Sequence, residues 1–91
     1  HHHNATLNAI GTFRYIAENY NQMKEAETKA SFKEKIQEIV ANEDQAVIQF
    51  LDDHNIKLRE AMLLLLGAIW NVLPKKSISP AILERIVNSI N

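Results

Sequence analysis

The chain has 91 residues, no cysteine, 23% charged residues and a formal net charge of −1. It therefore has room for one small domain, and it has no disulfide and no cysteine-ligated metal site. Leu, Ile, Val and Phe together supply 27 residues, well above the share of roughly 20% below which chains tend to be disordered. The composition excludes a disordered tail, a disulfide scaffold and a collagen-like chain, and it argues against a strongly basic nucleic-acid arm.

The first three residues are all histidine, which is typical of an expression-tag remnant. We therefore expect one domain over residues 4–91. The longest apolar run, residues 61–66, is far shorter than the roughly 20 residues of a membrane-spanning helix. The lack of cysteine and of a visible leader leads us to expect the cytoplasm or another reducing intracellular compartment.

Helix-forming residues dominate, and the chain has only two glycines and two prolines. No hairpin turn signal and no sustained alternation of apolar and polar residues is present. We predict an all-α fold, a compact four- to five-helix bundle with short loops. The first helix should begin near residue 4 or 6 and end near Tyr20, because Ile10, Phe13 and Ala17 recur at helical spacing.

The next segment contains two apolar stripes that do not share a phase. Met23 and Phe32 are nine residues apart, or two and a half helical turns, so their side chains would point in opposite directions. The four residues that begin with Ser31 match the capping box S-x-x-E. We therefore favour a helix over 31–41 preceded by a looser turn. One kinked helix over 22–41 is the alternative.

The third helix should begin at Asn42. Asparagine is a good N-cap, a glutamine follows three residues later, and two acidic residues lie in the first turn near the positive end of the helix. Asn55 is expected to end this helix in a left-handed conformation.

The fourth helix, over 56–73, is apolar on nearly all sides, which is typical of a helix at the centre of a bundle or facing a partner. Pro74 should end it. The fifth helix should begin with Ser79 as its N-cap and Pro80 as its first residue.

No catalytic motif stands out. The chain has no phosphate-binding loop, no G-x-G-x-x-G and no H-E-x-x-H, and His54 is the only histidine outside the tag. Asp52, Asp53 and His54 are reasonable metal ligands by type. On a regular helix, however, consecutive residues diverge by about 100°, so the three cannot all face one ion. We expect neither an enzyme nor a cofactor nor a metal site, and the sequence indicates no small-molecule substrate.

Charge is unevenly distributed. Residues 1–53 carry five basic and nine acidic side chains, whereas residues 54–91 carry five basic and two acidic ones. An acidic face on the third helix would attract a basic partner; its members are Glu43, Asp44, Asp52 and Asp53. Basic residues of the C-terminal half support an alternative, a small nucleic-acid-binding regulator; they are Lys57, Arg59, Lys75, Lys76 and Arg85.

Gly67 is the most unusual residue of the fourth helix, because glycine inside a helix costs about 1 kcal/mol relative to alanine. Leu63 and Trp70 lie about one turn to either side, so the missing side chain makes a notch. Close helix packing inside the bundle is the commoner reason for such a feature. The other interpretation is an exposed pocket for a side chain from another protein or a second copy.

Together these features predict a non-catalytic interaction module, a small regulator or a domain of a larger protein. We expect it to bind another protein, or a second copy of itself, through Leu63, Gly67 and Trp70 and through the acidic face of the third helix.

Overall fold

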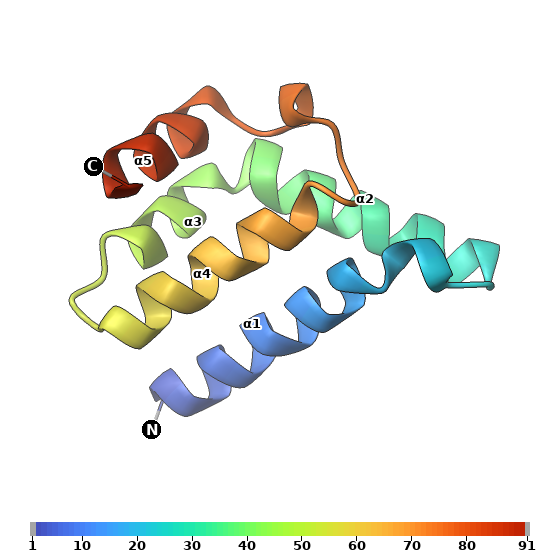
Figure 1. The fold of residues 1–91 in the computed structure, drawn as a ribbon, viewed down its shortest axis with the longest axis horizontal. Helices are drawn as coiled ribbons and strands as arrows, with labels where there is room; N and C mark the ends of the chain where they lie inside the picture. Colours follow the sequence, from blue (N-terminus) through green and yellow to red (C-terminus); the bar gives the residue numbers. More distant parts are fainter. Residues whose placement is uncertain (1, 91) are drawn as a thin grey trace.

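The computed structural model describes residues 2–90, which form five α-helices and two short 3-10 helices (Figure 1). No strand occurs within this range, and the predicted all-α bundle is confirmed. In chain order the elements are α1 (His2–Glu18), η1 (Tyr20–Gln22), α2 (Ala26–Asn42), α3 (Asp44–Leu51), α4 (Ile56–Ile69), η2 (Lys75–Ser77) and α5 (Pro80–Ile90).

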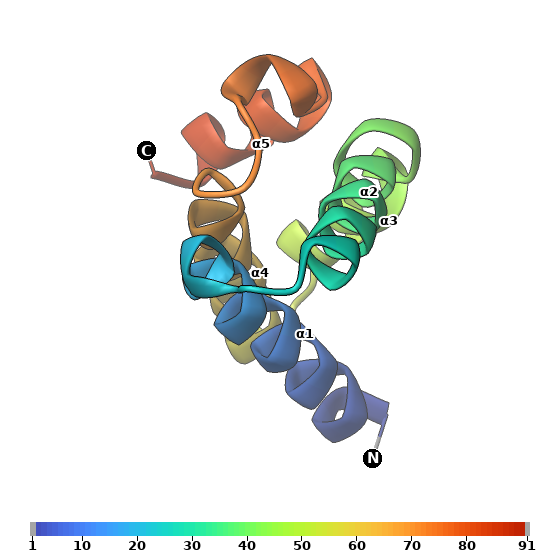
Figure 2. The same ribbon diagram turned by 90° about the vertical axis from the view of Figure 1, so that its right-hand side faces the viewer.

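Two helices pack against α4. Helix α1 lies alongside α4, and α3 packs against α4 from another side. Helix α5 packs on α3, and α2 contacts both α3 and η2. Figures 1 and 2 show α1 running beneath the rest of the molecule, with α2 and α3 together above it. None of the helices in the described range is both long and apolar enough to cross a bilayer.

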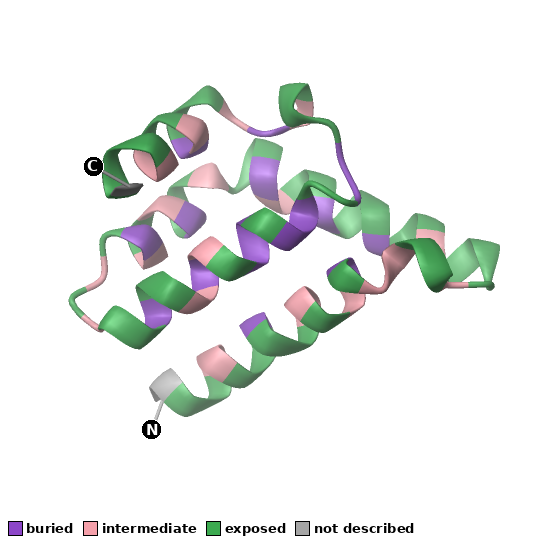
Figure 3. Ribbon diagram, in the orientation of Figure 1, coloured by how far each residue is buried: buried purple, intermediate pink, exposed green. Residues whose placement is uncertain are grey.

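The buried residues face inward from all five helices (Figure 3). Six of them belong to α4, whose other side is exposed; they are Leu58, Met62, Leu65, Leu66, Ala68 and Ile69. A small aromatic cluster joins the start of α2 to the end of α1. There the ring centroid of Phe32 lies 6.1 Å from that of Phe13 and 6.3 Å from that of Tyr20.

Helix α2 is continuous, so the favoured start at Ser31 is wrong, and its extent is close to that of the alternative. Ser31 is an exposed residue inside the helix. The conflict of phase disappears because Met23 lies outside α2, in extended backbone with φ −69° and ψ 133°. Ala26 and Ala30 are exposed, and exposed methyl groups do not have to follow the buried stripe.

The expected caps at the two ends of α3 are also wrong. Asn42 is the last residue of α2, and Glu43 alone separates the two helices. Asn55 has φ −75° and begins α4 instead of ending α3. Its Oδ1 accepts hydrogen bonds from the backbone N–H of Lys57 at 2.9 Å and of Leu58 at 3.4 Å, and these bonds satisfy N–H groups that a helix leaves unpaired.

Helix α4 ends at Ile69, four residues earlier than expected, and its last predicted turn is replaced by tighter turns. Helix α5 begins as predicted, with Pro80 as its first residue. The backbone N–H of Ala81 donates to Ser79 Oγ at 3.2 Å. Ser79 also donates its backbone N–H to the carbonyl oxygen of Val40 at 3.0 Å. The start of α5 is thereby attached to the end of α2.

Candidate binding groove

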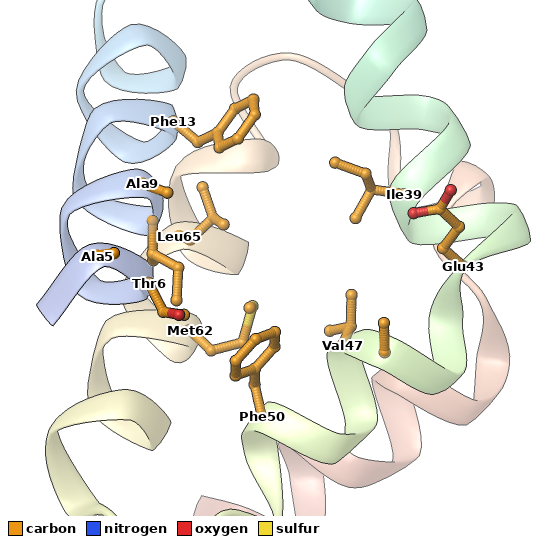
Figure 4. Close-up of a pocket in the computed structure, with 12 residues that line it drawn as sticks. Ala5, Thr6, Ala9, Phe13, Ile39, Glu43, Val47, Phe50, Met62 and Leu65 are labelled. Carbon is orange, nitrogen blue, oxygen red and sulfur yellow. The ribbon is translucent and has the colours of Figure 1, made fainter. Parts of the chain in front are cut away.

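An apolar groove lies between α1 on one side and α2 and α3 on the other, with α4 as its floor (Figure 4). Its volume is about 420 Å³. All of the lining residues except Thr6 and Glu43 are apolar. The lining comprises Ala5, Thr6, Ala9, Ile10, Phe13, Ile39, Glu43, Ala46, Val47, Phe50, Met62 and Leu65.

Two small side chains widen the groove at its wall on α1, which also includes Thr6, Ile10 and Phe13. Ala5 and Ala9 carry only a methyl group, and in Figure 4 they face Ile39 and Val47 across the opening. Helix α1 packs along α4, which holds this wall in place beside the floor. An open, largely preformed apolar hollow of this size is typical of a binding site.

Two phenylalanines lie at opposite ends of the groove. Figure 4 shows Phe13, from α1, at one end and Phe50, from α3, at the other. Both side chains are only half-buried, so part of each ring remains available for contact. Met62 and Leu65 are buried and form a closed floor between them.

One charge lies at the edge of the groove. Glu43, between α2 and α3, is exposed, and no described residue forms an ion pair with it. Residues 4–13 on the opposite wall carry no charge. The groove is therefore apolar with a single carboxylate at its rim.

The other three residues of the predicted acidic face have partners within the chain. Asp44 accepts a hydrogen bond from the Ser79 hydroxyl, with 2.8 Å between Oδ2 and Oγ. Asp52 forms an ion pair with Arg85, with 3.2 Å between Oδ1 and an Nη atom. Asp53 Oδ1 accepts the backbone N–H of Asn55 at 2.8 Å. These carboxylates join α3 to α5 and shape the turn before α4, and only Glu43 reaches the groove.

The basic residues of the predicted alternative are dispersed. Lys57 and Arg59 lie in the first turn of α4, and Lys75 and Lys76 lie in η2; Figure 1 shows these two segments far apart. Arg85 is paired with an acidic residue of the same chain. The structure therefore brings together no more than two of the five basic residues in any one segment.

The residues of the predicted apolar contact lie on the outer side of α4. Trp70 is 43% exposed and Leu63 is half-buried. Gly67 is exposed, and a Cβ atom placed on it would meet no described atom within 4 Å. Close helix packing inside the bundle is therefore not the reason for this glycine. The ammonium group of Lys75 lies 5.2 Å from the centre of the Trp70 ring, a distance at which a cation and an aromatic ring attract each other.

The described residues contain no group of three or more metal-binding side chains. Sequence reasoning missed the groove, although Ala5, Ala9 and Phe13 repeat at four-residue intervals beside the core stripe of α1. Such a repeat points to a groove only once the packing partner of α1 is known. No protein-family model matches this chain, and neither a curated protein nor a solved structure matches it.

Proposed function

We propose that this chain is a non-catalytic protein-interaction module that receives an amphipathic helix of a partner protein in the groove. The observation that carries the proposal is an open hollow of about 420 Å³ with ten apolar residues among its twelve lining residues. Apolar surface left open on a small domain commonly marks an interaction site. A hydrophobic groove between helices is a well-known receptor for the apolar stripe of another helix.

The groove sets an upper limit on affinity. Burying one large apolar side chain contributes about 1.5–3 kcal/mol, and the hollow offers space for two or three such anchors between Phe13 and Phe50. Association and ordering of the partner cost a large part of this gain. We expect a dissociation constant of about 1 µM or weaker.

The rim predicts the charge of the partner. Glu43 has no cationic partner among the described residues, and the opposite wall is neutral. A lysine or arginine beside the apolar stripe of the partner helix would pair with this carboxylate. Charge pairs at the edge of an interface mainly affect specificity and the rate of association. The expected partner is therefore an apolar-faced helix with a basic flank.

The proposal can be tested with a displayed library of amphipathic helical peptides selected on the wild-type protein. Peptides that are enriched should carry basic residues beside an apolar stripe. Their affinity, measured singly by fluorescence anisotropy, should fall at least about tenfold when Ala9→Phe fills the groove, since one blocked anchor costs more than 1.4 kcal/mol. Ala30→Phe is the matched control, because Ala30 is also an exposed helical alanine but does not line the groove.

A charge reversal tests the rim separately. Glu43→Lys should weaken the selected peptides and leave the fold intact, because the side chain is exposed. Peptides that bind Ala9→Phe as well as they bind the wild type would refute the proposed site. A selected pool without basic residues would refute the proposed charge of the partner but not the groove.

The nucleic-acid alternative has less support, because the structure disperses the basic residues and pairs Arg85 internally. It predicts binding to labelled duplex DNA that weakens steeply as salt rises. It also predicts loss of that binding when Lys75 and Lys76 are both changed to alanine.

A further inference from the structure

A second apolar surface runs along the outer side of α4, on the opposite side of that helix from the groove floor. Residues that recur every three or four positions share one face of a helix. On α4 and the turn after it, the exposed or half-buried members of this face are Ile56, Lys57, Arg59, Glu60, Leu63, Leu64, Gly67, Trp70 and Asn71. We call this set the outer stripe.

The outer stripe contains a hole and a projection one turn apart. At Gly67 a Cβ atom would meet no described atom within 4 Å, so the backbone lies open. Trp70 is three residues further on and keeps 43% of its surface exposed. Glycine lowers the stability of a helix relative to alanine, and nothing in the fold of the single chain requires it here.

This arrangement is self-complementary. A two-fold axis that passes between Gly67 and Trp70, perpendicular to α4, places each tryptophan over the glycine of the other copy. A symmetric dimer needs this reciprocity, because both copies use the same surface. Tryptophan is also the residue most often found at the energetic centre of an interface.

Charges on the outer stripe lie away from its centre. Its three charged residues, Lys57, Arg59 and Glu60, belong to the first turns of α4, whereas Leu63, Leu64, Gly67 and Trp70 carry no charge. The two-fold axis therefore brings uncharged surface of one copy against uncharged surface of the other.

We propose that a second copy of this chain binds the outer stripe, with the two α4 helices antiparallel and each Trp70 seated over the other copy's Gly67. The dimer leaves both grooves open, because the groove floor faces the other way. It therefore does not depend on the proposed function, and failure of one proposal leaves the other standing.

The test uses a matched pair of glycine substitutions in tag-free protein. Gly67→Leu fills the proposed hole, and Gly11→Leu fills an equivalent open position on α1, where a Cβ atom also meets nothing within 4 Å. Leucine favours helices more than glycine does, so both variants should unfold a few degrees higher than the wild type. If one of the variants then shows the apparent mass of a monomer, unfolding is not the cause.

Sedimentation equilibrium over about 10 µM to 1 mM should give a dimer for the wild type and for Gly11→Leu. Gly67→Leu and Trp70→Lys should raise the dissociation constant at least about tenfold. Trp70 is the only tryptophan, so its emission should move to shorter wavelength as the wild type associates. A wild type that stays monomeric would overturn the proposal. A dimer unaffected by Gly67→Leu, or one equally weakened by Gly11→Leu, would do the same.

Discussion

Replacing Ser79 with alanine removes two hydrogen bonds that can be separated by a double-mutant cycle. The hydroxyl accepts the backbone N–H of Ala81 at 3.2 Å and donates to Asp44 at 2.8 Å. The bond from the Ser79 backbone N–H to Val40 involves no side-chain atom and remains. The first lost bond is an N-cap and the second joins α5 to α3.

The expected loss is large for a domain of this size. An N-cap serine contributes about 1 kcal/mol. A hydrogen bond to an ionised carboxylate contributes about 1.5–3 kcal/mol, of which we expect about 1 kcal/mol here because both residues are only half-buried. Ser79→Ala should therefore lower the free energy of unfolding by about 2 kcal/mol, out of a total of about 5–10 kcal/mol.

Urea denaturation of Ser79→Ala, Asp44→Ala and the double variant measures the pair directly. The coupling energy should be about 1 kcal/mol. Ser79→Ala removes the N-cap both with and without Asp44, so the contribution of the cap cancels in the cycle. Ser77→Ala is the control, since the Ser77 side chain forms no hydrogen bond with any described residue. A coupling energy near zero would refute the role assigned to Asp44 and would leave that carboxylate available to a partner.

Substitutions at three further positions test other parts of the structure by the same denaturation assay. Asn55→Ala should lower the free energy of unfolding by about 1 kcal/mol, and Asn55→Asp should lower it much less, because aspartate also caps the start of a helix. Equal losses for the two variants would contradict the role of Asn55 as the N-cap of α4. Asp52→Ala should cost less than about 0.5 kcal/mol, because the side chains of the ion pair with Arg85 are 48% and 43% exposed; a loss above 1 kcal/mol would contradict this. Phe32→Ala should cost about 3–5 kcal/mol, since it empties the aromatic contact between α1 and α2. Phe32→Leu should recover much of that loss, and an alanine variant as stable as the wild type would be inconsistent with this packing.

Features set by neighbouring residues were predictable from the sequence. The start of α5 needs only a serine followed by a proline, because the cap and the fixed φ of proline act within one turn. The apolar residues of α4 left two positions open, the centre of the bundle and a surface that faces a partner; one side of α4 is buried and the other is exposed. The start of α5 was predictable because its cap and its proline do not depend on where the other helices lie.

Features set by competition between local and distant interactions were not predictable. Ser31 begins a good capping motif, but Phe32, Ile36 and Val40 are buried along one face of a helix that already started at Ala26. The packing of that face keeps the helix continuous through the motif. In the same way, asparagine suits either end of a helix. Asn42 ends α2 instead of beginning α3, and Asn55 caps the start of α4 instead of ending α3.

The groove was hidden for a different reason. Its wall on α1 includes two alanines, and alanines look the same in a sequence whether they face solvent, a neighbouring helix or a hollow. What makes Ala5 and Ala9 part of a site is the separation between α1 and the pair α2 and α3, and no local pattern specifies that separation.

The pairing of α1 with α4 also bears on the order in which the chain folds. Helix α3 packs against α4, which follows it after a short turn, whereas α1 must find α4 across the whole of α2 and α3. Closing the longer loop costs more chain entropy, and contacts distant in sequence form more slowly. Helices α2 to α5 can thus assemble first, with α1 docking onto a partly formed bundle. Local opening in the native state should follow the same division, with the amides of α1 exchanging as one unit. The groove would then be the last surface to appear during folding and the first to be lost.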